Sequence, residues 1–333
     1  METEILQTNE PELFAEAIAR AAAVLRAGDL VAVPTETVYG LAANVLETAA
    51  VAKIFEAKDR PQKNPIIVHV ANETMARDCV ADWPDAAAAL AREFWPGPLT
   101  LVLPKAEIIP ANVTAGGDTV GVRCPGHPFL RELIGACRFP LAVPSANLSN
   151  HVSPTTAAHV QSQIAGRIPL IIDGGAAEVG IESTVVDLTG DGARVLRPGM
   201  ISAEAIGAVE AVAAVPNPSQ GPLKSPGQLP RHYAPNARLL VLTWRDGEDL
   251  EGQIAYSRTP ADRVCVIAHT EAVPGTRFGR VTMLPREPAA YARALYAELH
   301  QCDAEGAEMI VVETVPDTDD WRAIADRLER AGR

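Results

Sequence analysis

The chain has 333 residues and a formal net charge of −13, with 47% hydrophobic and 21% charged residues. These values exclude disorder, collagen and coiled coil for the bulk of the chain, and the length favours two globular domains. The acidic total argues against tight non-specific binding of nucleic acid. No run of 18 apolar residues predicts a membrane span, and the acidic first residues lack the apolar core of a signal peptide. Five unpatterned cysteines are typical of reduced thiols, so we expect a cytoplasmic protein.

Residues 1–212 mix helical and strand patterns. A helical pattern over 13–25 stops at Gly28, and the apolar run 29–35 predicts a buried strand. Further strand patterns occur both singly between helices and in succession, so we expect an α/β domain with a mixed sheet. The expected strands are 64–70, 98–104, 119–123, 140–145, 168–173, 183–189 and 193–199, and the expected helices are 49–58, 86–94, 128–136, 155–165 and 202–212.

Residues 213–235 form a predicted proline-rich linker, because 216–235 contain six prolines and two glycines. Proline removes hydrogen-bond donors and fixes φ, which excludes a helix or a central strand. After the linker, strand patterns alternate with helical ones, so residues 236–333 are expected to form a smaller, open α/β domain of Rossmann-like type without a glycine fingerprint. Its expected strands are 237–244, 263–270, 277–285 and 307–315, and its helices are 288–304 and 319–331.

Polar side chains that can bind anions follow several of the apolar runs. In open α/β sheets ligands bind beyond the carboxyl ends of strands, so this placement predicts a site. Each residue alone also fits an ordinary turn, cap or core position. The set contains neither a nucleophile with an activating base nor metal-ligand spacing. Its guanidinium and ammonium groups are Lys58, Arg60, Arg123 and Arg197, and its hydroxyl and amide groups include Thr35, Ser145, Asn147, Ser153 and Ser183.

The order and spacing of these motifs resemble the YrdC-like family of L-threonylcarbamoyladenylate synthases, over residues 15–212. The resemblance implies a twisted mixed sheet around a concave site, and the stretch SPGQLPRHYAP (225–235) resembles the longer, two-domain branch. The family more often has glycine at the place of Asn150, a residue that tolerates left-handed backbone angles. The motifs are PTETVYGLAANV (34–45), KDRPQKNPIIVHV (58–70), FWPGPLTLVLP (94–104), VGVRCPGHP (120–128), VPSANLSNHVSPT (143–155), GIESTVVDLTG (180–190) and VLRPGMIS (195–202).

The resemblance implies an ATP-dependent enzyme that makes L-threonylcarbamoyl-AMP from L-threonine, bicarbonate or CO2, and ATP, with release of pyrophosphate. Its product would pass to a separate transferase complex that modifies tRNA next to the anticodon to threonylcarbamoyladenosine. Mg²⁺ is expected to arrive with ATP, with no protein-held metal, no membrane partner and no stable binding of tRNA.

The resemblance also implies roles for individual residues. Threonine would be bound by Thr35, His69, Arg123 and Ser183. The nucleotide would be bound by Arg60, Asn64, Thr119, Ser145, Ser153 and Arg197, with His232 and Tyr233 of the linker folding over it as a lid. The catalytic residues would be Lys58, Arg60, Ser145 and Asn147.

Two other functions would suit parts of the sequence. A double-stranded RNA-binding module would suit a concave basic surface, but the first 215 residues hold 15 basic against 25 acidic side chains, and aromatic residues make up only 5% of the chain. A carbamoyl-transfer maturation factor would need cysteine-rich modules, and the chain has no CxxC pair.

The lid interpretation gives a first prediction. Changing His232 and Tyr233 together to alanine should raise the ATP concentration needed for half-maximal activity and leave the fold intact. Steady-state kinetics with varied ATP would measure this, and unchanged kinetics would remove the lid.

Overall fold

The computed structural model describes residues 2–212, 223–227, 231–270 and 277–333. The chain divides into two compact units, and each is described by itself. Unit 1 comprises Met1–Ser149 and Ser153–Gln228, and unit 2 comprises Asn150–Val152 and Leu229–Arg333. Much of the predicted linker, 213–222 and 228–230, lies outside the described residues, so its boundaries remain a prediction.

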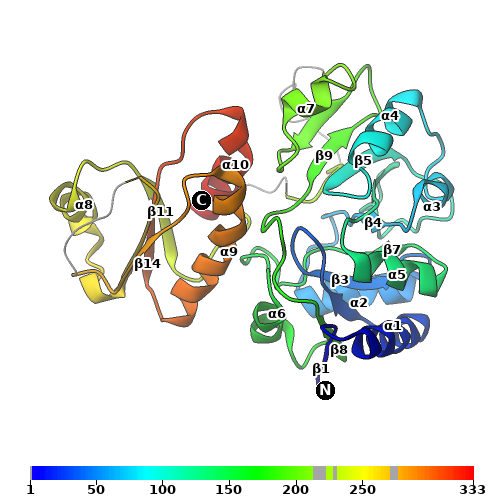
Figure 1. The fold of residues 1–333 in the computed structure, drawn as a ribbon, viewed down its shortest axis with the longest axis horizontal. Coiled ribbons are helices and arrows are strands. Elements are labelled where there is room, and N and C mark those ends of the chain that lie inside the picture. The colour runs from blue at the N-terminus through cyan, green and yellow to red at the C-terminus, as the bar shows by residue number, and fades with distance from the viewer. Residues whose placement is uncertain (1, 213–222, 228–230, 271–276) are drawn as a thin grey trace. The chain divides into compact units, whose positions relative to one another are not determined.

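Unit 1, drawn mainly in blue to green in Figure 1, is built on a ten-stranded sheet with the order β1-β8-β2-β3-β7-β4-β6-β5-β9-β10. The sheet contains both parallel pairs, such as β5 with β9, and antiparallel pairs, such as β5 with β6, which confirms the mixed sheet. The strands are β1 (Glu4–Gln7), β2 (Val31–Val33), β3 (Gly40–Asn44), β4 (Val68–His69), β5 (Leu99–Pro104), β6 (Thr119–Arg123), β7 (Leu141–Ala142), β8 (Leu170–Asp173), β9 (Thr184–Asp187) and β10 (Arg194–Arg197).

Helices cover both faces of this sheet, and in β2 the residues alternate between two apolar clusters. Val31 and Val33 of β2 pack with α1 and α5, whereas Ala32 belongs to the cluster that includes α2, α4 and α6. The helices of this unit are α1 (Pro11–Arg26), α2 (Thr48–Lys58), α3 (Glu73–Asp78), α4 (Asp85–Phe94), α5 (Pro128–Cys137), α6 (Ala157–Ile164) and α7 (Ala203–Gly207).

Short strands at the centre of the sheet present the polar side chains. Strand β7 has only two residues and lies between Pro140 and Pro144, which cannot donate to a ladder. Strand β4 is equally short and ends at His69, which is in register with Arg123 at the end of β6. The sequence predicts both strands, but over longer ranges.

Unit 2 contains a four-stranded sheet with the order β11-β14-β12-β13, and all its pairs are parallel. This confirms the predicted open α/β domain. Leu250, Val264, Val266, Met309 and Val311 form part of its core. The elements are β11 (Arg238–Leu242), α8 (Gly247–Ile254), η1 (Ala255–Ser257), η2 (Ala261–Arg263), β12 (Val264–Ala268), β13 (Arg280–Met283), α9 (Pro288–Ala304), β14 (Met309–Glu313), η3 (Asp319–Trp321) and α10 (Arg322–Ala331).

The structure contains several helices and strands that the sequence does not predict. Strands β1 and β3 and helices α3 and α8 were not predicted, and the helix expected at 202–212 ends at Gly207. Every residue of β3 is buried, so its sequence GLAAN lacks the polar alternation that marks a half-exposed strand. Asn150 has a left-handed φ of 69°, as its place in the motif allows.

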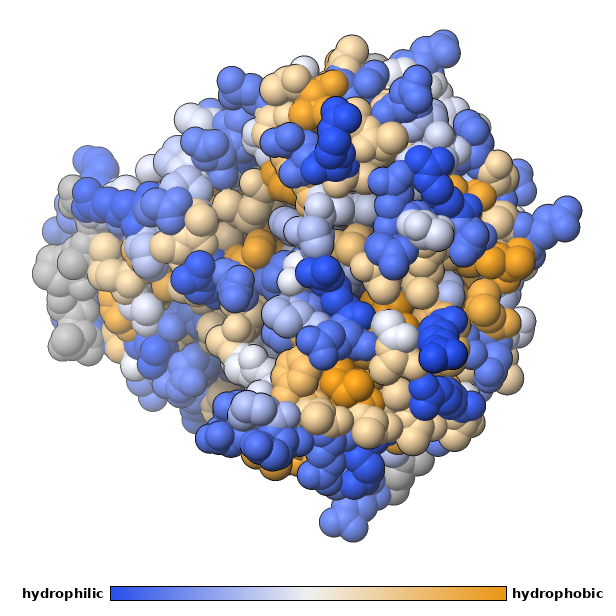
Figure 2. Space-filling model, turned by 45° about the vertical axis from the view of Figure 1, so that its right-hand side comes forward, coloured by the Kyte–Doolittle hydropathy of each residue, from blue (hydrophilic) through white to orange (hydrophobic). Residues whose placement is uncertain are grey.

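The surface is a mixture of polar and apolar side chains. On the face shown in Figure 2, hydrophilic residues are interspersed with smaller hydrophobic patches. Each helix in the described part of the chain is too short or too polar to cross a membrane.

Packing around β3 generates a prediction. A Cβ added at Gly40 would lie 2.3 Å from Val143 Cγ1, whereas one added at Gly135 in α5 meets no atom within 4 Å. Gly40→Ala should therefore destabilise the protein by about 1–3 kcal/mol through overpacking. Gly135→Ala is the matched control and should stabilise it by about 0.5–1 kcal/mol, because alanine favours helix. Calorimetric melting would measure both, and an unchanged melting temperature for Gly40→Ala would contradict this packing.

Candidate active site

The turn after β2 is fixed by its own hydroxyl groups. Thr35 Oγ1 donates to the carbonyl of Val38 (2.7 Å) and accepts from the backbone N–H groups of Thr37 and Val38. The same atom lies 2.9 Å from Thr37 Oγ1. Thr35 and Thr37 are buried, so this turn is a rigid support for the residue between them, Glu36.

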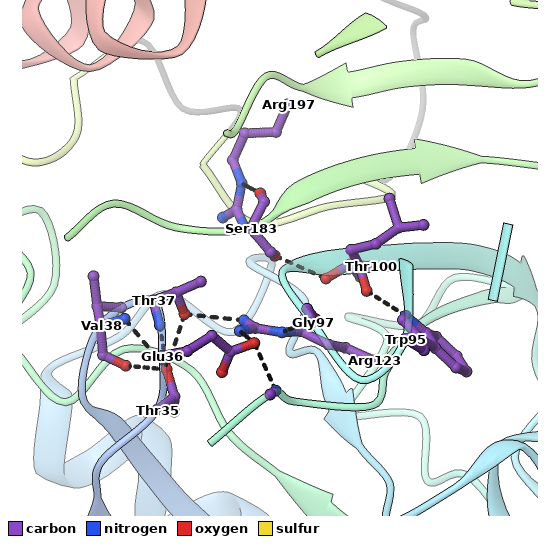
Figure 3. Close-up of polar contacts among 12 residues, drawn as sticks. Thr35, Glu36, Thr37, Val38, Trp95, Gly97, Thr100, Arg123, Ser183 and Arg197 are labelled. Atoms are coloured by element: carbon purple, nitrogen blue, oxygen red, sulfur yellow. Dashed lines mark hydrogen bonds and ion pairs between the residues drawn. The ribbon is translucent and has the colours of Figure 1, made fainter. Parts of the chain in front are cut away.

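A buried ion pair links this turn to the end of β6. Arg123 Nη2 lies 2.6 Å from Glu36 Oε1, and both side chains are less than a tenth exposed. Arg123 also donates from Nη1 to Thr37 Oγ1 (3.1 Å) and from Nε to the Gly97 carbonyl (3.3 Å). Figure 3 shows the guanidinium between these partners. The guanidinium is therefore held in one orientation, by hydrogen bonds from Nε and Nη1 and by the ion pair at Nη2.

The charges at this point set two pKa values. Burial raises the pKa of Glu36, but the Arg123 charge and the N–H of Gly126, 2.8 Å from Oε1, outweigh it and hold the pKa below its ordinary value. Burial, and then the Arg123 charge, lower the pKa of His69 to about 3. At neutral pH, Glu36 is therefore a carboxylate and His69 a neutral imidazole.

A second network of hydrogen-bonded polar side chains lies at the start of β9. Ser183 Oγ accepts from Arg197 Nη2 (3.0 Å) and lies 2.8 Å from Thr100 Oγ1, while Arg197 Nε donates to the Ser183 carbonyl (3.1 Å). A Cβ at Gly199 would lie 2.4 Å from the Thr184 nitrogen, so only glycine lets the turn after β10 approach this strand. The contacts bring Ser183 and Arg197 together (Figure 3).

The segment Gly97–Pro98 joins the hydrogen-bond network around Arg123 to the one around Ser183. The Gly97 carbonyl accepts from Arg123, and the neighbouring Pro98 carbonyl accepts from the N–H of Thr184 (3.0 Å). The residues predicted to bind L-threonine therefore lie in one region of unit 1. Thr35 and Arg123 both contact the Thr37 hydroxyl, and His69 pairs with Arg123 in the sheet. Ser183 is linked to them through its neighbour Thr184, which donates to Pro98.

Lys58 connects helix α2 to the turn at 145–147. Its buried Nζ donates to the carbonyls of Ser145 and Asn147, at 2.5 Å each. Burial and the Arg60 charge lower its pKa well below the ordinary value. The backbone of the turn lies against β3, because the Ala146 N–H donates to the Tyr39 carbonyl. Three of the predicted catalytic residues, Lys58, Ser145 and Asn147, are thus in direct contact.

Arg60 and Asn64 lie in the loop after α2. Arg60 donates from Nε to the Asn64 carbonyl (3.2 Å) and from Nη2 to the Pro65 carbonyl (2.7 Å). Pro65 lines a recess with Thr119, Thr100 and Val185, and the described linker residues Lys224, Ser225 and Pro226 line it too. Lys224 Nζ is 3.0 Å from Asp187 Oδ2, so this part of the linker is tied to β9.

The remaining predicted nucleotide residues are divided between the units. Ser153 is fully buried in unit 1 and donates to Glu182 Oε1 at 2.5 Å. His232 and Tyr233 belong to unit 2, where the Tyr233 ring lies 5.0 Å from the Arg327 guanidinium and stacks on Tyr296. Tyr233 has a φ of 61°, unusual for a bulky residue. Their role at the nucleotide stays a prediction.

Five residues in this network were not named from the sequence. They hold the predicted residues in place by hydrogen bonds: Glu36, Thr37, Gly97, Thr100 and Glu182. Glu36 and Thr37 lie inside the PTET motif and Glu182 inside GIEST, so the motifs used to predict the site already contained these three residues. Thr100 lies within an apolar strand, where nothing in the sequence marks it.

Two family models match the chain. The Sua5_yciO_yrdC model, described as telomere recombination, matches residues 23–199, and the Sua5_C model, described as threonylcarbamoyl-AMP synthase, C-terminal domain, matches 201–332. The threonylcarbamoyl-AMP synthase of Pyrococcus abyssi is 42% identical over 93% of this chain and 92% of its own length. That of Bacillus subtilis is 40% identical over 99% and 95%.

Solved structures show the same architecture. The crystal structure of P. abyssi Sua5 complexed with L-threonine has a TM-score of 0.89 and 40% identity, over 99% of this chain and 98% of that one. A structure of a double alanine variant of that protein also gives a TM-score of 0.89. The chain therefore belongs to the Sua5/YrdC family, in its two-domain branch. Its full-length relatives in that branch are threonylcarbamoyl-AMP synthases.

The state of His69 gives a prediction for pH. An unfolded histidine titrates near 6.5, so the stability that neutral His69 contributes is present above that pH and is lost as the pH falls toward 3. The Cε1–H nuclear magnetic resonance signal that disappears in His69→Gln should show no inflection between pH 5 and 8. An inflection near pH 6.5 would contradict the burial of an uncharged imidazole.

Proposed function

We propose that this chain makes threonylcarbamoyl-AMP from L-threonine, CO2 or bicarbonate, and ATP, with release of pyrophosphate. The observation that carries the proposal is the buried Arg123 guanidinium, oriented beside His69 and Thr35 in a chain that belongs throughout to the family of these synthases. This full-length similarity does not favour the RNA-binding module or the maturation factor.

L-Threonine is bound at the end of β6. Arg123 donates to Gly97 and Thr37 and forms an ion pair with Glu36, and N–H groups of Nη1 and Nη2 that make no hydrogen bond here can bind a carboxylate as a fork. Neutral His69 and the Ser183 hydroxyl suit the threonine hydroxyl and the reacting groups, while Thr35 fixes the turn beside them through its own hydroxyl.

ATP is bound across the loop after α2, the turn at 145–147 and the end of β10. The residues proposed for this are Arg60, Asn64, Thr119, Ser145, Ser153 and Arg197, with Lys58 and Asn147 fixing the turn. Among the described residues there is no group of three or more His, Cys, Asp and Glu side chains suited to a metal ion. Mg²⁺ is accordingly proposed to enter on the phosphates of ATP. The tie between Lys224 and Asp187 supports a linker that closes over this site.

The reaction proceeds in two steps. The threonine amine attacks the carbon of CO2, forms an N–C bond and gives up a proton to yield a carbamate. A carbamate oxygen then attacks the α-phosphorus, the bond from that phosphorus to the bridging oxygen breaks, and pyrophosphate leaves. Positioning and cationic stabilisation of phosphoryl charge suffice, and no covalent enzyme intermediate is needed. Exclusion of water would protect the carbamate.

The cellular setting is part of the same proposal. Threonylcarbamoyl-AMP is an activated donor, so a tRNA threonylcarbamoyl transferase complex is proposed to receive it for modification next to the anticodon. The five cysteines are buried, unbridged thiols, which supports a cytoplasmic location.

Pyrophosphate release tests this function. Release from ATP with Mg²⁺ should require both L-threonine and bicarbonate, and Arg60→Ala should reduce it by about 10²-fold or more, because a cation on the phosphates is lost. Glu73→Gln on the exposed face of α3 is a control and should leave the rate unchanged. Release that does not depend on threonine, or an undiminished rate in Arg60→Ala, would contradict the proposal.

A further inference from the structure

Glu36 is a buried carboxylate that the proposed roles leave without a function of its own. Its Oε1 atom forms an ion pair with Arg123 Nη2 at 2.6 Å and accepts a hydrogen bond from the N–H of Gly126 at 2.8 Å. Thr35 and Thr37, on either side of it, hold the turn through their hydroxyls. The side chain is therefore fixed in position and cannot be explained as a solvated surface group (Figure 3).

The second oxygen of this carboxylate differs from the first, and it is one of several buried polar atoms in this region, with Arg123 Nη2 and His69 Nδ1, that lack a hydrogen-bond partner among the described residues. Glu36 Oε2 is buried and has no hydrogen-bond partner among the described residues. Buried polar atoms are nearly always hydrogen-bonded, and a carboxylate oxygen left without a partner is costly. An atom of this kind in a ligand site points to a donor that the ligand brings.

The position of Oε2 limits what that donor can be. Both oxygens belong to one carboxylate, so Oε2 lies beside the guanidinium that is proposed to bind the threonine carboxylate. In L-threonine the ammonium and carboxylate groups share one carbon, so a carboxylate on Arg123 brings the ammonium close to Glu36. Guanidinium and carboxylate together match the two charges of an amino-acid zwitterion. Neutral His69 carries no positive charge that would repel the ammonium.

We infer that Glu36 binds the α-ammonium group of L-threonine through Oε2, and so makes the site select α-amino acids over hydroxy acids of the same shape. This inference rests on the proposed function, because it assumes that Arg123 binds the threonine carboxylate. Glu36 would set the affinity for threonine more than the rate of the chemical step, since the ammonium must lose its proton before the nitrogen attacks CO2.

Ligand binding to Glu36→Gln tests the inference. Glutamine retains an oxygen for Arg123 and Gly126, but removes the negative charge at the Oε2 position. Calorimetric titration should show L-threonine binding weakened by about 10–100-fold, the range for a lost charge-assisted hydrogen bond. (R)-3-Hydroxybutanoate, which keeps the carboxylate and hydroxyl of threonine but lacks the amine, should bind with a dissociation constant changed less than about threefold.

Kinetics give a second readout. In Glu36→Gln the KM for L-threonine should rise by the same factor, while kcat and the KM for ATP change by less than about threefold. Glu36→Asp, which restores the charge on a shorter side chain, should recover part of the threonine affinity. The exposed Glu73→Gln should match the wild type in every measurement.

Two results would overturn the inference. Equal weakening of threonine and 3-hydroxybutanoate would mean that Glu36 acts only by holding Arg123, and unchanged threonine affinity would mean that Oε2 meets no ligand. Failure of the proposed function is distinguishable, because it would appear in the wild type as absence of threonine binding and of threonine-dependent pyrophosphate release.

Discussion

The ion pair between Glu36 and Arg123 constrains the rest of the candidate site. Taking both charges out of water is expensive, and the cost is offset only if each group is also hydrogen-bonded. Thr37, Gly97 and Gly126 supply those bonds, so the turn after β2, the segment before β5 and the loop after β6 must all adopt compatible positions. Truncating one partner, so that its hydrogen bonds are lost as well as its charge, typically costs about 3–5 kcal/mol, which makes the arrangement sensitive to such changes.

Backbone hydrogen bonds extend this constraint to the other motifs. The N–H groups of Val179 and Gly180 donate to the carbonyls of Glu36 and Thr37, and the Tyr39 N–H donates to the Pro154 carbonyl. Segments that are far apart in the chain therefore meet at the same turn. Since these backbone donors and acceptors are paired with one another, the backbone of the motifs is held in place, which favours a site that acts by positioning.

The two units contain different parts of the candidate site. Unit 1 contains the residues proposed to bind L-threonine and most of those proposed to bind the nucleotide. It also contains the described linker residues 223–227. Unit 2 holds His232 and Tyr233, and Tyr233 is buried there against Tyr296 and Arg327. A change at Tyr233 therefore removes packing in unit 2 as well as any contact with a nucleotide, so the stability of unit 2 has to be measured beside the kinetics of such variants.

The sequence by itself determined the mixed sheet, the parallel second domain and the family, because these depend on local periodicity and on the order of short motifs. It also indicated Arg123, His69 and Ser183, since each motif carries its own polar residue at a strand end. Only the tertiary structure decided that β3 is a strand, because full burial removes the alternation that would mark it. It also decided that Glu36 and Thr100 contact the predicted residues Arg123 and Ser183. Their importance lies in partners distant in the chain, and no local pattern encodes a contact that exists only after the sheet has formed.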